Sequence, residues 1–145
     1  NVFSGKIRNW DDVPGAKQKG TIDLFVRTPA SGTQDAFDKI FMSPLKIFSG
    51  ASQKASNGLV QQSVKSDKAG VGYVSEAFTK GLSVATYKGV PCTLRNAKSG
   101  QYGGVRNFYF VTRGAANGAA KKWIKWVRSN PAALKIAASE WVPFK

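Results

Sequence analysis

An apolar strand, a tight turn that carries an arginine, and a helix follow one another within residues 21–41, and this succession constrains the fold most. Pro29 and Ala30 predict the turn, and the helix is predicted to open on Ser31-Gly32-Thr33. The apolar residues of the strand are Ile22, Leu24, Phe25 and Val26. Those of the helix recur at i, i+3 and i+4 spacing and are Ala36, Phe37, Ile40 and Phe41.

The start of that helix has the chemistry of a small oxyanion site. A helix N-terminus leaves backbone N–H groups unpaired and carries a partial positive charge. Two hydroxyls (Ser31 and Thr33) and the guanidinium of Arg27 add further donors, and Gly32 lets the backbone approach a ligand closely. Ser and Thr are also ordinary helix caps, so a purely structural role for the Ser31-Gly32-Thr33 turn remains an alternative.

Composition narrows the classes of function. The chain has 145 residues, enough for one domain with a sizeable core, and 22 Lys+Arg against 8 Asp+Glu give a net charge of +14. That charge favours acidic partners, although a merely alkaline extracellular protein would share it. With no histidine and the lone Cys92, neither an ordinary zinc site nor a base for a Ser31 nucleophile is available. We therefore expect no enzyme, no metal and no cofactor.

Strand and helix patterns alternate along the rest of the chain, which predicts an α/β fold. Further strands are expected over residues 71–74, 82–87 (an edge strand) and 106–112, and residues 42–56 are expected to be irregular. Helices are expected over residues 57–66 with Ser56 as the cap, 115–128 and 131–140. The opening NVFSGKIRNW has the character of a helix end, so we expect the chain to be a fragment of a longer polypeptide.

Five blocks in order resemble the phosphate-binding proteins of bacterial ABC importers, which have the periplasmic-binding-protein type II fold. The blocks are VFSGKIRNWDD, VRTPASGTQDAF, SNGLVQQSVKSDKAGVGYVS, QYGGVRNFYFVT and the C-terminal AASEWVPF. The resemblance implies a mixed sheet flanked by helices, in a protein of two lobes with the ligand between them. Residues 1–104 would form the second lobe with half of the anion site. Residues 105–145 would form a crossing strand and the C-terminal helical part of the first lobe, whose upstream part is missing.

The same resemblance implies roles for individual residues. Arg27 would pair with ligand oxygens, Ser31 and Thr33 would donate through hydroxyl and backbone N–H, and Gly32 through its N–H, with Gln34 a weaker candidate. The family often has an acidic or small polar residue two positions after the arginine that could orient it, whereas this chain has Pro29. The implied partners are inorganic phosphate or a similar oxyanion, a membrane ABC permease and the upstream lobe, in an extracytoplasmic location and without nucleic acid.

Arg106 and one basic helix are two further candidates for a functional role. Arg106 could approach the cleft, but we expect it to form a structural ion pair at the hinge. One helix combines aromatic with basic residues, a pattern that can also bind nucleic acid or an anionic surface. We expect Trp123 to lie in the core and the basic residues to be solvated, and keep a basic interaction module as the alternative function. The residues concerned are Lys121, Lys122, Trp123, Lys125, Trp126 and Arg128.

Overall fold

A parallel sheet of three strands lies at the centre of the larger part of the chain. The structure is a computed structural model and describes residues 1–142. β1 (Asp23–Arg27) is the central strand, between β2 (Ser52–Lys54) and β3 (Gly70–Gly72). Both neighbours pair with β1 in parallel, so the strands described form a parallel sheet and the expectation of a mixed one is wrong.

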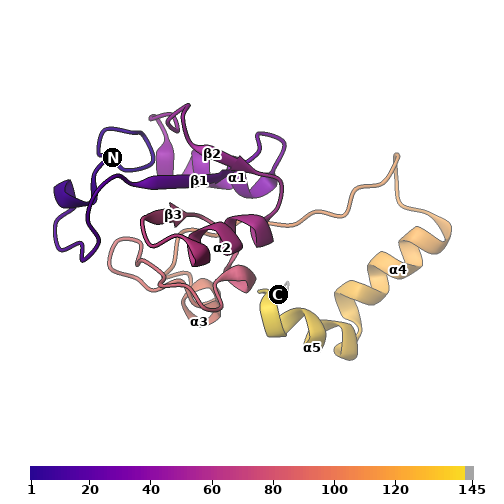
Figure 1. Ribbon diagram of the computed structural model, residues 1–145. Coiled ribbons are helices and arrows are strands. Elements are labelled where there is room, and N and C mark those ends of the chain that lie inside the picture. Colours follow the sequence, from indigo (N-terminus) through magenta and orange to yellow (C-terminus); the bar gives the residue numbers. More distant parts are fainter. Residues whose placement is uncertain (143–145) are drawn as a thin grey trace.

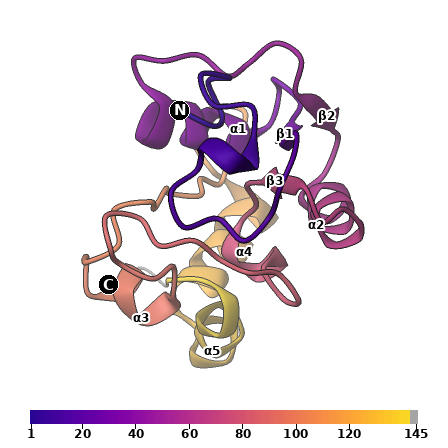
Figure 2. The same ribbon diagram turned by 60° about the vertical axis from the view of Figure 1, so that its left-hand side comes forward.

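Helices cover both faces of this sheet, as Figure 2 shows for α1 (Gly32–Phe37) and α2 (Asn57–Ser66). α1 runs directly into the π-helical turn η2 (Asp38–Met42), so residues 32–42 are continuously helical. The α/β prediction is confirmed. The core of this part contains alternate residues along β1, the residues next to the ends of β1 and β3, and one residue each from η2 and α2. They are Ile22, Leu24, Val26, Met42, Val60 and Tyr73.

The glycines of β3 are explained by the approach of the elements around them. A Cβ at Gly72 would lie 2.7 Å from a methyl of Val60 and 2.8 Å from the carbonyl oxygen of Phe25. A Cβ at Gly70 would lie 2.9 Å from the Phe25 ring. Only residues without a side chain allow β3 to pack this closely against β1 and α2.

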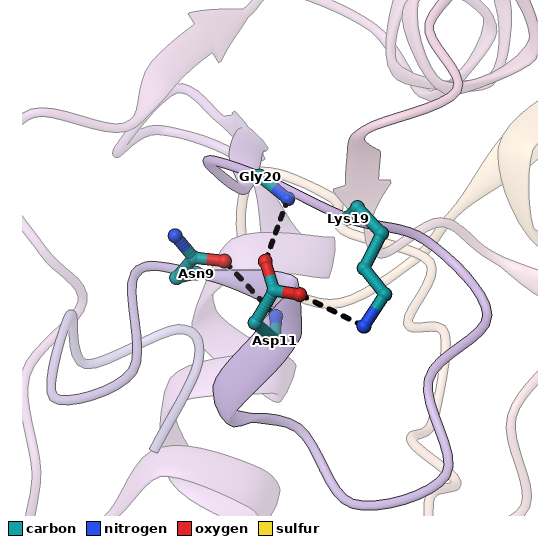
Figure 3. Close-up of polar contacts among 4 residues, drawn as sticks. All are labelled: Asn9, Asp11, Lys19 and Gly20. Atoms are coloured by element: carbon teal, nitrogen blue, oxygen red, sulfur yellow. Dashed lines mark hydrogen bonds and ion pairs between the residues drawn. The ribbon is translucent and has the colours of Figure 1, made fainter.

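The loop before β1 is fixed by one carboxylate, which Figure 3 shows. Asp11, in the short helix η1 (Trp10–Asp12), accepts a hydrogen bond from the Gly20 N–H at 3.0 Å and pairs with Lys19 at 2.8 Å. The Asn9 side chain caps η1 by accepting from the Asp11 N–H. The bond from Lys19, and then that from Gly20, lower the pKa of Asp11.

The first residues have the geometry with which helices end, as the sequence predicted. The Lys6 N–H donates to the Asn1 carbonyl and the Gly5 N–H to the Val2 carbonyl, with Gly5 at φ +76°. The 57–66 helix is confirmed as α2, with Ser56 as its cap. Within this helix Val60 is fully buried, whereas the neighbouring Leu59 is 46% exposed.

Short elements complete this part of the chain. η3 (Glu76–Phe78) follows β3, and α3 (Leu94–Lys98) was not anticipated from the sequence. Residues 82–87 form no edge strand, since the pairing there is the single bridge between Tyr87 and Val90. β2, in turn, lies within the stretch expected to be irregular.

Two helices stand apart at the end of an extended segment, as Figure 1 shows. They are α4 (Gly118–Ser129) and α5 (Pro131–Glu140), close to the predicted bounds. The strand expected over residues 106–112 is wrong, because this stretch has no secondary structure and lies largely exposed. The expectation that Trp123 lies in the core is also wrong: it is 55% exposed, and Ala119 and Ala120 are exposed too.

Within the described residues, no helix is long and apolar enough to span a bilayer. Positions 143–145, the end of the last expected segment, lie outside the described residues.

Candidate functional site

The carboxyl ends of the three parallel strands bring the polar side chains of the site together. Arg27 ends β1, Asn57 begins the helix after β2, and Ser75 follows β3 as the cap of η3. In open α/β sheets this edge is where ligands bind. The candidate site therefore comprises these three segments.

The helix after β1 begins with a side-chain cap. The Ser31 Oγ accepts hydrogen bonds from the backbone N–H groups of Thr33 at 3.1 Å and Gln34 at 3.3 Å, so the capping role is confirmed. Ser31 is buried, and its hydroxyl hydrogen is still available for donation. Within the described residues the Gly32 N–H has no hydrogen-bond acceptor, which leaves one backbone donor at the turn.

A line of short polar contacts joins that turn to the other two strand ends. The Thr33 and Ser75 hydroxyls lie 3.4 Å apart, and the Asn57 Nδ2 donates to the Ser75 Oγ at 3.2 Å. The Asn57 Oδ1 is buried and has no hydrogen-bond partner within the described residues. An orphaned buried acceptor is costly, and a donor from a ligand or from water would satisfy it.

Backbone carbonyls orient the Arg27 side chain. Its Nε donates to the Lys54 carbonyl at 3.3 Å and its Nη2 to the Ala55 carbonyl at 2.9 Å. These bonds use two of the five guanidinium N–H donors, which leaves three for a ligand. Both partners are neutral, and the ion pairs in the described part of the chain do not include Arg27, so its charge is not compensated there. The carbonyls at the end of β2 thus orient the guanidinium, the role that an acid in place of Pro29 could have.

The side chain of Gln34 is hydrogen-bonded within the fold through both its oxygen and its nitrogen. Its Oε1 accepts from the Tyr73 hydroxyl, its Nε2 donates to Asp38 at 2.9 Å, and the residue is buried. The Tyr73 hydroxyl in turn accepts from the Arg27 backbone N–H at 3.1 Å, and burial raises the pKa of Tyr73 to about 12. This network links α1 to the end of β1, and a ligand would have to displace one of its bonds to reach the Gln34 amide.

The acids on the same helical run have partners of their own. Asp35 pairs with Lys39 at 2.9 Å and Asp38 accepts from Gln34. Both also line a groove of about 270 Å³ together with Arg27, Pro29 and Gln34. Carboxylates repel anions, so an oxyanion at Arg27 has to bind on the side of the guanidinium that faces away from Asp35 and Asp38.

Asn57 and Ser75 did not emerge from the sequence as site residues. Each lies just after a strand and at the start of a helical turn, and this position is the sequence feature that could have identified it as a site residue. Because β2 was not predicted, Asn57 could not be assigned to the same sheet edge as Arg27.

The chain matches the PBP superfamily domain over residues 1–131. It is 26% identical over 141 residues to the phosphate-binding protein PstS of Bacillus subtilis, which covers 96% of this chain and 46% of that protein. It is 27% identical over 139 residues to phosphate-binding protein PstS 2 of Streptococcus agalactiae, covering 88% of this chain and 47% of the relative. The chain thus spans about half the length of the curated relatives it matches.

Solved structures share the fold. A candidate phosphate ABC transporter substrate-binding protein from Clostridium perfringens, solved with bound phosphate, superposes with a TM-score of 0.79 at 20% identity, covering 99% of this chain and 60% of that one. An ABC-type phosphate transport receptor from Vibrio cholerae gives a TM-score of 0.74 at 21% identity, covering 98% of this chain and 60% of the other.

Proposed function

The chain belongs to the PBP superfamily, and on that premise we propose that it supplies one side of a binding site for inorganic phosphate or a similar tetrahedral oxyanion. The observation that carries this proposal is the uncompensated Arg27 guanidinium at the carboxyl edge of the sheet. Its three remaining donors join those of Ser31, Gly32 and Thr33. Charge-assisted bonds from a guanidinium suit tetrahedral oxyanions, and the names of the relatives refer to phosphate.

Binding without catalysis fits the donors that are present. The Ser31 Oγ caps a helix, and the chain contains no histidine to activate it as a nucleophile. The groups assigned to the anion at this edge, those of Arg27, Ser31, Gly32 and Thr33, donate hydrogen bonds or carry positive charge. These groups can hold an anion, but they do not form the nucleophile and base of a hydrolase.

The site is completed in this proposal by the first lobe of the same polypeptide, which would face the groups described here. Residues 1–104 are assigned to the second lobe, and residues 105–145 to a crossing segment and the C-terminal helical part of the first. In support, α4 and α5 stand apart from the sheet (Figure 1), and large apolar side chains near them are exposed. Tyr109 is 79% exposed, Val111 88% and Ile136 73%, which leaves an apolar surface for an upstream lobe to cover.

A transport role follows from the same premise. The receptor would act outside the cytoplasm and deliver the oxyanion to a membrane ABC permease. The names of the Clostridium and Vibrio proteins refer to ABC-type phosphate transport for those proteins. Gln34 is the weaker candidate, because Tyr73 and Asp38 engage its side chain and the Ser31 hydroxyl accepts from its backbone N–H.

One observation favours a second candidate, a basic interaction module. The α4 helix exposes Trp123 and Trp126 beside Lys121, Lys122 and Lys125, in a chain of net charge +14. Aromatic rings among lysines can stack on nucleic-acid bases or lie on an anionic membrane.

Salt dependence separates the two candidates. Inorganic phosphate and single-stranded DNA are titrated separately into the polypeptide that carries both lobes, at low and at high salt. We expect phosphate to bind with a shallow salt dependence and DNA to bind weakly, with any affinity falling steeply as salt rises. Tight DNA binding combined with no phosphate binding would favour the interaction module and reject the receptor.

A further inference from the structure

A second guanidinium lies against the turn that the proposed function assigns to the anion. A methyl group built on Gly32 would lie 3.2 Å from Nη1 of Arg106, 3.6 Å from its Cζ and 3.7 Å from its Nη2. Arg106 is 79 positions from Arg27 in the sequence (106 less 27) and comes from the extended segment that leads to α4. The fold therefore brings a second arginine, from a separate segment, to the turn that follows Arg27 and β1.

The Arg106 charge has no carboxylate partner within residues 1–142. The ion pairs there join Lys19 to Asp11 and Lys39 to Asp35, and Asp38 is engaged by Gln34. The structural ion pair expected at the hinge is therefore wrong for the described residues. An uncompensated cation beside an unpaired backbone N–H, that of Gly32, adds to the positive potential at this turn.

The ring of Phe108 supports the guanidinium. Cζ of Arg106 lies 4.4 Å from the centre of that ring, within the range of a cation–π contact. Guanidinium N–H bonds lie in the plane of the group, so stacking on a ring leaves the donors at its edge available. The residue is exposed, and no described hydrogen bond uses its donors.

We propose that Arg106 is a second anion-binding arginine of this site and determines its preference for ligand charge. The inference rests on the proposed function. Arg106 donates to the oxyanion from the Gly32 side while Arg27 donates from the β1 side. Two guanidinium charges match a doubly charged oxyanion, such as monohydrogen phosphate or sulfate, better than a singly charged one. Gly32 has a specific role here, because a side chain at that position would push Arg106 away.

The decisive measurement is the phosphate affinity, by isothermal titration, of the polypeptide that carries both lobes and of three variants. Arg106→Gln keeps polar character and loses the charge, Arg106→Lys keeps the charge, and Arg113→Gln is the matched control on the same exposed segment. We expect Arg106→Gln to weaken phosphate binding at least tenfold and Arg106→Lys to weaken it less. Arg113→Gln should bind like the parent protein.

Charge preference and thermal unfolding distinguish ligand contact from a structural role. Arg106→Gln should lose more affinity for phosphate in alkaline solution, where the doubly charged form prevails, than in acidic solution, and should unfold at the parent temperature without ligand. If Arg27→Ala weakens binding but Arg106→Gln does not, this inference fails and the proposed function stands. If neither variant alters binding, the proposed function itself fails. Equal losses for Gln and Lys together with a lower unfolding temperature would make Arg106 structural and overturn the inference.

Discussion

The phenol oxygen of Tyr73 accepts a hydrogen bond from the backbone N–H of Arg27 at 3.1 Å, just beyond Phe25 and Gly72, the last pair between β1 and β3. Beyond the last backbone pair, the Tyr73 side chain continues the hydrogen bonding between the two segments. Its partner there is Arg27, which carries the guanidinium proposed to bind the ligand. The Tyr73 ring also stacks on Phe37 of α1, with 3.9 Å between ring centres. One tyrosine therefore links the strand end, the helix and the arginine.

Removing the guanidinium of Arg27 should weaken the site most directly. In the two-lobed polypeptide, Arg27→Ala is expected to cost about 2 kcal/mol of phosphate binding, roughly 30-fold in Kd, because charge-assisted bonds are lost from a partly desolvated site. Isothermal titration measures the change. Arg95→Ala, on exposed α3, is the control and should bind like the parent. Equal affinity of Arg27→Ala and the parent would remove Arg27 from the site.

Tyr73→Phe should destabilise the fold. The change leaves the Arg27 N–H and the Gln34 Oε1 without their partner in a buried place, at a cost of about 1–3 kcal/mol. Urea unfolding followed by circular dichroism provides the measurement. Tyr109→Phe, at a hydroxyl in a 79% exposed residue, should leave the midpoint unchanged. If Tyr73→Phe unfolds at the same urea concentration as the parent, the hydrogen bonds of the Tyr73 hydroxyl contribute nothing to stability.

Alkaline pH should weaken the fold through the same residue. Burial raises the pKa of Tyr73 from its ordinary 10.0 to about 12, so the folded state keeps the proton longer than the unfolded state does. The resulting stability is fully present below pH 10 and is lost between about pH 10 and 12, since the unfolded chain ionises first. The difference in unfolding free energy between the parent and Tyr73→Phe isolates this effect from the ionisation of lysines. It should shrink across that window, and a constant difference would contradict the assignment.

Gly72 should tolerate no side chain. A Cβ would lie 2.7 Å from Val60 and 2.8 Å from a backbone oxygen, so Gly72→Ala must shift β3 or α2, at a cost of about 1–3 kcal/mol. Gly103→Ala is the matched control, because its nearest neighbour would lie 3.9 Å away. Chemical denaturation of the two variants gives the comparison. Equal stabilities would show that the packing between β3 and α2 has room to relax.

The 145-residue chain alone should bind phosphate weakly, with a Kd of about 1 mM or weaker. Its donors reach the ion from one side, so water competes for each of them, and the +14 charge is screened over about 8 Å at physiological salt. Titration of the chain by calorimetry tests this. Micromolar binding by a monomer would show that one lobe suffices and that the proposed division of the site is wrong.

Local signals predicted helix starts well. Ser31, Ser56 and Pro131 each stand at the helix beginning that the sequence assigned to them, because capping and the fixed φ of proline act over a few residues. The strand-turn-helix around Arg27 was predictable for the same reason, since its apolar spacing and turn residues lie within one short stretch.

Strands could be predicted less well because a strand needs a partner. The polar Ser52-Gln53-Lys54 of β2 carries no apolar pattern and becomes a strand only through its pairing with β1. Residues 106–112 have strong β propensity but no neighbouring strand within the described residues, so they remain extended and unpaired. The role of Ala55 in orienting Arg27 was also hidden, because it uses a backbone carbonyl that every residue type possesses.

The aromatic run from Phe108 to Val111 has a consequence for how the chain behaves in a concentrated solution. Its side chains are between 45% and 88% exposed, and no hydrogen bond to described residues ties its backbone. Such a run is a template on which another chain can add as a strand, and no charged or proline residue interrupts it. A preparation of this chain by itself is therefore prone to aggregate through these four residues. The rate of aggregation should fall when another surface covers them.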